Sequence, residues 1–462
     1  MKNLILFSSI AFCLISCSKN DDYETIPEES LLDLSERIMA GGETTIFSTT
    51  SFAYSTPAPN LSNEYLAQHL RGDVEFESIF VTAPAEINSG LGPIFNNSSC
   101  ISCHPRDGRA SHPENLIARS GLIVRASLQG TNPNGGTIPV PGFGTQIQNQ
   151  AIFNFVAEAQ YQMLYEEFIE ILADGTEVHL RKPKIQFINT YQAIPSNILT
   201  SVRIGPPVFG LGLIELIPES NLIAAQDLND SNNDGIKGKL NYVWNPYTSQ
   251  TEVGRFGWKA NVSNLLIQCA GAYNDDMGIT NPIFQTETGF GQSNGSDGLQ
   301  DDPELPMNRL EDVVLYTQTL AVPAPRNITA TEVRKGAKIF ETIDCSKCHT
   351  PKQQTGYSPI KALSYQTFYP YSDMLLHDMG EGLADNRPDY LANGREWKTR
   401  PLWGIGLTFV VNNHTNFLHD GRARNLTEAI MWHGGEAENA KQKFKNLKTE
   451  ERNSLLSFLN SL

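Results

Sequence analysis

Residues 100–104 read CISCH, and residues 345–349 read CSKCH. Both segments have the pattern C-x-x-C-H, which is the attachment signature of c-type haem. Two thiols separated by two residues lie on one helical turn, where both can add to the two vinyl groups of one porphyrin. The histidine that follows then supplies an imidazole nitrogen to the iron. Two copies in a chain with seven cysteines predict two haem-binding segments.

The predicted attachment residues are Cys100, Cys103, Cys345 and Cys348, and the predicted proximal iron ligands are His104 and His349. A zinc site would use the same types of ligand. A thioredoxin-like redox pair would use C-x-x-C near a βαβ pattern. In both copies a histidine follows the second cysteine directly, and the chain looks exported. Both observations favour haem over the two alternatives.

The N-terminus predicts export. Met1 and Lys2 start the chain, and residues 4–15 form an apolar run too short to span a bilayer as a helix. The run ends in LISC at residues 14–17, which resembles a bacterial lipoprotein lipobox. We therefore expect residues 1–16 to be a signal peptide and Cys17 to be lipidated. The alternative is a plain secretory signal followed by a chance cysteine.

The formal net charge of the chain is -16, and removal of a leader containing Lys2 makes it more negative still. Such a surface disfavours nucleic acid and anionic membranes as partners. It would suit a cationic redox partner, although most acidic surfaces serve only solubility. Together with the leader, this predicts a lipoprotein of the cell envelope of a Gram-negative bacterium, anchored at the outer membrane.

The remaining cysteines can be assigned in turn. Cys13 leaves with the leader, Cys17 carries lipid and four cysteines carry haem, so only Cys269 remains. Cys269 lies in the apolar run LLIQCA at residues 265–270, which predicts a buried and inert thiol. We expect no structural disulfide.

The chain of 462 residues is long enough for two or three domains. We expect a mainly α fold with two cytochrome-c-like domains and a small β-insert in the first. The β-insert is expected at residues 162–187, where two strand-like runs flank the turn Asp174-Gly175. The predicted divisions are a tether and arm at 17–62, an N-terminal haem domain at 63–300 and a C-terminal haem domain at 326–462.

A second metal site is suggested by Asp230, Asn232 and Asp234, which match the first half of a calcium loop. The position that would carry the bidentate glutamate is Asn241, which weakens the match. An Asn/Asp-rich turn without calcium is the alternative.

Several blocks of unusual sequence lie between and after the two motifs. Those after the second motif include LLHDMG at 375–380, RPLWGIG at 400–406 and EAIMWHGG at 428–435. With the two C-x-x-C-H motifs they resemble the di-haem oxidoreductase family, often labelled thiol oxidoreductases. These proteins are relatives of the bacterial di-haem cytochrome c peroxidases and of MauG-like enzymes. Further blocks with the same resemblance lie at residues 90–96, 208–219, 254–260, 276–280 and 418–437.

The resemblance implies a division of labour between two haems. One haem has two axial ligands and relays electrons. The other leaves its distal face open to hydrogen peroxide, and a carboxylate nearby moves a proton from the inner to the outer oxygen. We expect the C-terminal haem to be the relay and the N-terminal haem to be the open site.

For the C-terminal haem, the resemblance places His433 at the position of the second axial ligand, which would give two histidine ligands and a lower potential than His/Met. Met431 is the rival, and Met277 and Met379 rank lower. The alternative for His433 is an exposed histidine near a helix end. His419 matches a block that shapes the haem edge, so we expect it to be structural.

For the N-terminal haem, Glu215 matches the block that holds the distal glutamate of the relatives, so it is the candidate catalytic residue. The alternative is a glutamate favoured by the dipole at a helix N-terminus. His112 is close enough in sequence to cap the iron in a resting state. Trp258 is a candidate relay between the haems, although a buried tryptophan in a core is more common.

Two functions therefore remain open. The first is a peroxidase-like enzyme that takes electrons from an unknown partner and reduces peroxide or another small substrate. The second is a di-haem cytochrome that only carries electrons at the cell envelope. A zinc-stabilised envelope protein remains only if haem is absent. The residues give no support for a thiol substrate, because no redox-active cysteine pair remains after haem attachment.

Overall fold

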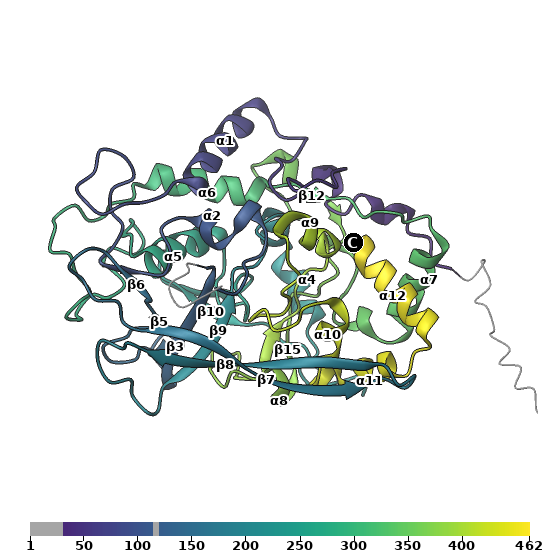
Figure 1. Ribbon diagram of the computed structural model, residues 1–462. Helices are drawn as coiled ribbons and strands as arrows, with labels where there is room; N and C mark the ends of the chain where they lie inside the picture. The colour runs from purple at the N-terminus through teal and green to yellow at the C-terminus, as the bar shows by residue number, and fades with distance from the viewer. Residues whose placement is uncertain (1–30, 114–119) are drawn as a thin grey trace, which may run out of the picture.

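The computed structural model describes residues 31–113 and 120–462 (Figure 1). Its residues are about 30% helical and 19% in strands, and the strands form many small sheets. The prediction of a mainly α fold with two cytochrome-c-like domains and a small β-insert is therefore wrong. Most strands are only two to four residues long, which is too short for an alternating pattern to show in the sequence. The predicted leader and Cys17 lie outside the described residues.

The α-helices range from four to fifteen residues. They are α1 (Asn63–Glu77), α2 (Cys100–Cys103), α3 (Leu211–Glu215), α4 (Glu219–Ala225), α5 (Leu265–Met277), α6 (Met307–Thr319), α7 (Thr331–Thr342), α8 (Gly380–Leu383), α9 (Thr408–Asn412), α10 (Leu426–Met431), α11 (Glu438–Lys445) and α12 (Thr449–Ser461).

Strands of four residues or more lie in the middle of the chain, and the remaining strands have two or three residues. The longer ones are β3 (Leu122–Thr131), β7 (Gln160–Ile171), β8 (Glu177–Ile188), β9 (Leu199–Ile204), β10 (Tyr242–Asn245) and β11 (Gln250–Val253). The shorter ones are β1 (Thr45–Ile46), β2 (Ile94–Phe95), β4 (Thr137–Ile138), β5 (Gln146–Ile147), β6 (Gln150–Ala151), β12 (Val322–Pro323), β13 (Gln353–Gln354), β14 (Thr367–Phe368), β15 (Leu376–Asp378) and β16 (Glu396–Lys398).

Helices α1, α5 and α6 pack together around the first C-x-x-C-H motif (Figure 1). Helix α1 begins where the Ser62 hydroxyl accepts a hydrogen bond from the backbone N–H of Tyr65. Asn264 caps α5 in the same way through the N–H of Ile267. Gly278 ends α5 in a left-handed conformation, which glycine adopts at little cost. These local signals explain why the helices begin and end where they do.

Helices α7 and α12 form a close pair beside the second motif (Figure 1). Gly336 on α7 faces the backbone of Ser454 on α12, and a Cβ added there would lie 1.9 Å from the Ser454 carbonyl oxygen. Such a separation is far below van der Waals contact. Only glycine allows the two helices to pack this closely.

We therefore expect Gly336→Ala to destabilise the protein by about 1–3 kcal/mol, the usual range for overpacking a close contact. The measurement is chemical unfolding followed by circular dichroism. Gly271→Ala on α5 is the matched control, because its Cβ would meet no atom closer than 3.9 Å. Equal unfolding free energies for the two variants would contradict the close packing of α7 and α12.

Strands β7 and β8 form the predicted hairpin, which the structure confirms. They pair antiparallel over twelve residues each, from Gln160 opposite Ile188 to Ile171 opposite Glu177. The β-structure extends further than predicted, because β3 pairs antiparallel with β9 and also carries β4 and β5. The β-region thus runs from Leu122 to Ile204.

The hairpin reaches across to the C-terminal helices (Figure 1). Asp174 at its turn pairs with Arg452 of α12, and Glu170 lies 3.3 Å from Lys441 and 3.0 Å from Lys445 of α11. Phe168 makes an edge-to-face contact with Trp432 at 5.4 Å between ring centroids. The hairpin therefore connects the sheet to the region around His433.

A buried ion network joins distant parts of the chain. Asp389 lies 2.7 Å from Arg387 and 2.5 Å from Arg203 of β9, and Asp385 lies 2.7 Å from Lys259. The side chains of Lys259 and Arg387 are fully buried. Burial alone would raise the pKa of Asp389, but the nearby cations outweigh this and hold its pKa below the ordinary value.

Two large hydrophobic clusters form the core, and each combines residues from both predicted haem domains. The first joins Tyr273 and Tyr316 to Trp403, and the second joins Leu122 to Phe458. The predicted domain boundaries stay a prediction. In the described part of the chain, no helix has the length and apolar character needed to cross a membrane.

Candidate functional site

A cavity of about 220 Å³ lies beside the second C-x-x-C-H motif. Its lining is mostly apolar, and it includes Cys345, Cys348 and His349. A distant segment, helix α10 and the residues just after it, forms another part of the wall. Its lining residues are Leu426, Ala429, Ile430 and His433. The structure therefore brings the motif and the predicted second ligand to one enclosed space.

His349 is oriented by the backbone. Its Nδ1 lies 3.0 Å from the carbonyl oxygen of Tyr371. A carbonyl oxygen only accepts, so Nδ1 carries the proton and Nε2 keeps a lone pair. Burial lowers the pKa of His349 to about 4, with the neighbouring His433 as the next cause. The imidazole is neutral at pH 7, which is the form that binds iron.

His433 has the same arrangement. Its Nδ1 lies 2.8 Å from the carbonyl oxygen of Ala429, one turn earlier at the end of α10, which leaves Nε2 with a lone pair. Burial also lowers its pKa. A hydrogen bond from the second ring nitrogen is the usual way in which proteins orient a histidine ligand. The two histidines thus form a matched pair of nitrogen donors.

The competing methionines lie elsewhere. Met431 is almost completely buried in the second hydrophobic cluster and is not among the residues that line the cavity. Met277 is buried in the first cluster. Met379 does line the cavity, but a thioether is a weaker match to the second ligand position than His433.

The described residues also include one group that could hold a metal ion, namely Cys348, Asp373 and His377. It uses one thiol of the motif and neither Cys345 nor His349, so it does not match a zinc site built on C-x-x-C-H. His377 is held by Asp373 and Glu436, each at 2.8 Å. Burial alone would lower the pKa of His377, but these bonds raise it well above the ordinary value.

The first motif forms helix α2, and His104 follows it directly. Its Nδ1 lies 2.7 Å from the carbonyl oxygen of Pro206, so Nε2 again keeps a lone pair. Burial lowers the pKa of His104 to about 4. The thiol of Cys103 accepts a hydrogen bond from Asn97 at 3.2 Å, and burial raises its pKa to about 12. Both motifs therefore present a neutral histidine fixed by a carbonyl group.

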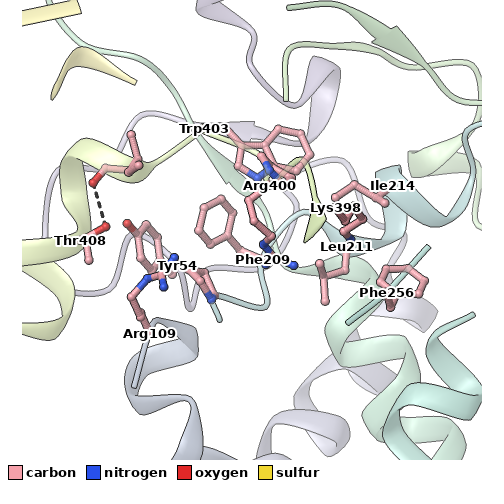
Figure 2. Close-up of a pocket in the computed structure, with 13 residues that line it drawn as sticks. Tyr54, Arg109, Phe209, Leu211, Ile214, Phe256, Lys398, Arg400, Trp403 and Thr408 are labelled. Carbon is pink, nitrogen blue, oxygen red and sulfur yellow. Dashed lines mark hydrogen bonds between the residues drawn. The ribbon is translucent and has the colours of Figure 1, made fainter. Parts of the chain in front are cut away.

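A smaller cavity of about 50 Å³ begins at Pro207, next to the residue that holds His104 (Figure 2). Its wall includes the aromatic rings of Phe209 and Phe256 and the cations of Arg109, Lys398 and Arg400 (Figure 2). This cavity shares its three cationic residues with the larger one.

Glu215 is half-buried at the end of α3. Its carboxylate accepts hydrogen bonds from the backbone N–H of Leu265 and from Gln318, both at 2.7 Å. Burial raises its pKa. Leu211 and Ile214 line the small cavity, whereas Glu215 is not among its lining residues. In this structure Glu215 caps the start of α5.

His112 makes contacts with the protein through both ring nitrogens, and its role near the iron stays a prediction. Its Nε2 lies 2.6 Å from the carbonyl oxygen of Asp420, and its Nδ1 lies 2.8 Å from the Tyr165 hydroxyl. Both ring nitrogens are therefore engaged. His419 stacks on Trp397 with ring centroids 3.8 Å apart, which fits the expected structural role.

Trp258 lies in the wall of the larger cavity. Its indole N–H donates to the carbonyl oxygen of Ile204 at 3.0 Å. The guanidinium carbons of Arg400 and Arg109 lie 4.8 Å and 5.6 Å from the centre of its ring. Such cation–π contacts stabilise the ring in place.

The Asp230 loop uses its oxygens within the loop. Asp230 accepts the backbone N–H groups of Asp234 and Gly235 at 2.8 and 3.0 Å, and Asn232 accepts the Asp234 N–H at 3.0 Å. Asp234 also lies 3.1 Å from Lys347. Asn241 is buried and its amide bonds to Lys259 and Asp389 instead. Calcium at this loop stays a prediction.

Two features have no signal in the sequence alone. One is the group of Arg109, Lys398 and Arg400, and the other is the clamp on His377. Arg400 belongs to a block that stands out in the sequence and lies two residues after Lys398, but Arg109 is distant along the chain. Only the contacts across the fold bring them together.

A family model described as "Di-haem oxidoreductase, putative peroxidase" matches residues 35–462. No curated protein matches the chain. One solved structure, titled "Kuenenia stuttgartiensis Hydrazine Synthase Pressurized with 20 bar Xenon", has 14% sequence identity over 100% of both chains and a TM-score of 0.34. A likeness at this TM-score carries no argument about the fold or the site.

Proposed function

The chain belongs to the di-haem oxidoreductase family, and from that premise we propose that it is a peroxidase-like enzyme with one covalently attached c-type haem on each C-x-x-C-H motif. Cys100 and Cys103 would hold the first haem and Cys345 and Cys348 the second. The carrying observation is that His349 and His433 line one apolar cavity, each with Nδ1 fixed by a backbone carbonyl.

In the C-terminal site, the protein presents two neutral imidazoles to one enclosed space. Two nitrogen donors fill both axial positions of an iron and favour electron transfer over binding of a further ligand. The walls are mostly apolar, and burial lowers the pKa of both histidines, which favours their uncharged forms. We therefore assign the relay role to this site, with His349 proximal and His433 distal.

In the N-terminal site, His104 would be the proximal ligand, and Glu215 would move a proton between the two oxygens of a bound peroxide. A haem held by Cys100, Cys103 and His104 would supply the peroxide chemistry. The overall reaction consumes two electrons and two protons per hydrogen peroxide and forms two waters. Burial raises the pKa of Glu215, which supports this role because it makes the carboxyl group a stronger base than an exposed glutamate.

Trp258 would carry electrons between the two sites. It lies in the wall of the larger cavity and contacts Arg109 and Arg400, which also line the smaller one. The electrons would come from an unknown partner protein. The net charge of -16 suits a partner with a cationic surface.

The alternative is a cytochrome that only carries electrons. Two observations favour it: both carboxylate oxygens of Glu215 are engaged in hydrogen bonds, and the cavity beside the first motif is the smaller of the two. For either function we propose a lipid anchor at Cys17 and a place in the outer membrane of a Gram-negative envelope. Calcium at Asp230, Asn232 and Asp234 is proposed only as a structural addition.

Low-temperature electron paramagnetic resonance of the mature protein separates the two functions. We expect a high-spin ferric signal, at rest or after reduction by one electron, from the N-terminal site. Two low-spin signals that persist in both states would support the electron carrier instead. Absence of any haem signal from correctly matured protein would overturn both.

Replacing His433 with alanine is expected to convert the C-terminal low-spin signal to high spin, because one axial nitrogen is lost. Met431→Leu is the matched control, since it lies two residues away and is buried elsewhere. Its spectrum should equal that of the unchanged protein. A low-spin signal that persists in His433→Ala and disappears in Met431→Leu would assign the ligand to methionine.

A further inference from the structure

Three cations lie at the boundary between the two cavities. Arg109, Lys398 and Arg400 line both the cavity of about 220 Å³ and the one of about 50 Å³. Figure 2 shows all three around the smaller cavity, with Arg109 beside Tyr54. Arg109 and Lys398 are buried, with 8% and 4% of their surface exposed. Lys398 and Arg400 are two residues apart and Arg109 is distant in the chain, so the fold has brought the charge of Arg109 to that of the other two.

Within the described residues, these cations have no acidic partner. Arg109 donates to the carbonyl oxygen of Leu418 at 3.0 Å, and Lys398 donates to that of Arg255. The guanidinium of Arg400 contacts the face of Trp258. A neutral carbonyl oxygen or a ring face offsets only part of the cost of removing a full charge from water.

The acids of the larger cavity already have partners. Asp234 pairs with Lys347, Asp344 with Lys443 and Glu436 with His377. The smaller cavity has no acidic residue in its lining. The three cations therefore face the cavities and not a protein carboxylate.

The pKa of each of the three groups is lowered. Burial lowers the pKa of Arg109 to about 10 and that of Arg400 to about 9, and Arg109 lowers the latter further. Burial and Arg400 together lower the pKa of Lys398 well below its ordinary value. Three such positive charges close together and without an anion destabilise the fold, because each charged group loses hydration without gaining a partner of opposite charge.

We infer that Arg109, Lys398 and Arg400 bind the propionate carboxylates of both haems and so form one shared anion site between the two cavities. This inference rests on the proposed function. Arginine presents a planar fork that matches a carboxylate in two hydrogen bonds, and lysine adds a point charge. A free anion would explain the charge, but it would not explain why all three residues line both cavities.

A shared cluster would also change the reduction potentials of both haems. A cation near a haem disfavours the ferric state, which carries one more positive charge than the ferrous state. The cluster therefore raises both reduction potentials, and loss of one cation lowers both. This effect is measured directly and needs no catalytic assay.

The experiment is a spectroelectrochemical titration of the mature, full-length holoprotein carrying Arg400→Gln or Lys398→Met. We expect both haems to remain attached. We expect the reduced-to-oxidised ratio of each haem to fall about tenfold at a fixed potential, which is 59 mV for one electron. Arg400→Lys keeps the charge and should restore most of the potential.

Arg395→Gln is the matched control. It removes an arginine that pairs with Asp378 at 2.8 Å and with Glu381 at 3.2 Å, and its side chain is 46% exposed. Its potentials should equal those of the unchanged protein. Potentials in Arg400→Gln and Lys398→Met that equal those of Arg395→Gln would overturn the inference.

A titration of the unchanged protein with sodium acetate provides an independent measurement that requires no variant to fold. Propionates held by the cluster predict potentials that do not change with acetate at constant ionic strength. Potentials that shift with acetate would show an exchangeable anion in the cluster and overturn the inference. Absence of covalent haem in the unchanged protein would instead overturn the proposed function.

Discussion

Replacing Cys345 and Cys348 together with alanine is expected to lower the covalent haem content from two haems per chain to one. Each thioether bond uses one thiol, so removing both thiols leaves none for attachment at the second motif, while the first motif remains intact. The measurement is the pyridine haemochrome absorbance of denatured protein together with its intact mass.

The same variant is expected to lose stability. Without its haem, the cavity of about 220 Å³ stays unfilled. At roughly 24 cal/mol per Å³ of cavity, this corresponds to about 5 kcal/mol. Residual non-covalent haem would reduce the loss, so denaturing extraction should be checked before unfolding is measured.

Cys269→Ala is the matched control for haem content. Cys269 is buried in the first hydrophobic cluster and its nearest polar contact is Thr317 at 3.9 Å. Its removal should leave two haems per chain. Equal haem content in the control and in the double variant would contradict attachment at the second motif.

Replacing Asp389 with asparagine is expected to destabilise the protein by about 3–5 kcal/mol, the range for removing one partner of a buried ion pair. Asp389 pairs with Arg387 and Arg203, and all three side chains are at least nine-tenths buried. Asparagine would leave Arg387 without its carboxylate partner and Arg203 with only Asp385, which lies 3.8 Å away. The measurement is denaturant unfolding at pH 7.

Asp312→Asn serves as the surface control for this experiment. Asp312 receives two hydrogen bonds from Arg71, at 3.0 and 3.1 Å, but the Arg71 side chain is 61% exposed. Exposed pairs contribute no more than about 1 kcal/mol. If Asp389→Asn lowers the free energy of unfolding no more than Asp312→Asn does, the buried network adds little stability.

The effect of Asp389 also depends on pH. Its pKa in the folded protein lies below the ordinary value of about 3.9, so its stabilisation is fully present above that pH and is lost as pH falls toward the folded pKa. The difference between the unchanged protein and Asp389→Asn should therefore narrow below about pH 4, by about 1.4 kcal/mol per unit. A difference that stays constant from pH 7 to pH 3 would contradict this assignment.

Family membership could be predicted from the sequence because its signals are local. Each C-x-x-C-H motif is one turn of chain with its own chemistry, and the blocks after the second motif need no knowledge of the fold to be recognised. The β7–β8 hairpin was also predictable, since alternating residues and the Asp174-Gly175 turn are local as well.

The predicted fold class was wrong because most strands of the protein are too short to show an alternating apolar and polar pattern in the sequence. Strands β15 and β16 have three residues each, and their paired residues are far apart in the sequence. The pairing therefore leaves no local sequence pattern. Such pairs form where surrounding segments hold two stretches side by side. Periodicity describes only elements that are long enough to repeat.

The sequence by itself was enough to identify the two motifs, the family and His433 as a candidate ligand, because each of these depends on residues adjacent in the chain. Tertiary structure alone decided that His433 faces the same cavity as His349 while Met431 is buried elsewhere. It also decided that Arg109, Lys398 and Arg400 meet between two cavities, and that Asp389 lies among buried cations. Burial and the distance between charges depend on how separate segments pack, and these two quantities set the ligands, the pKa values and the stability of the site.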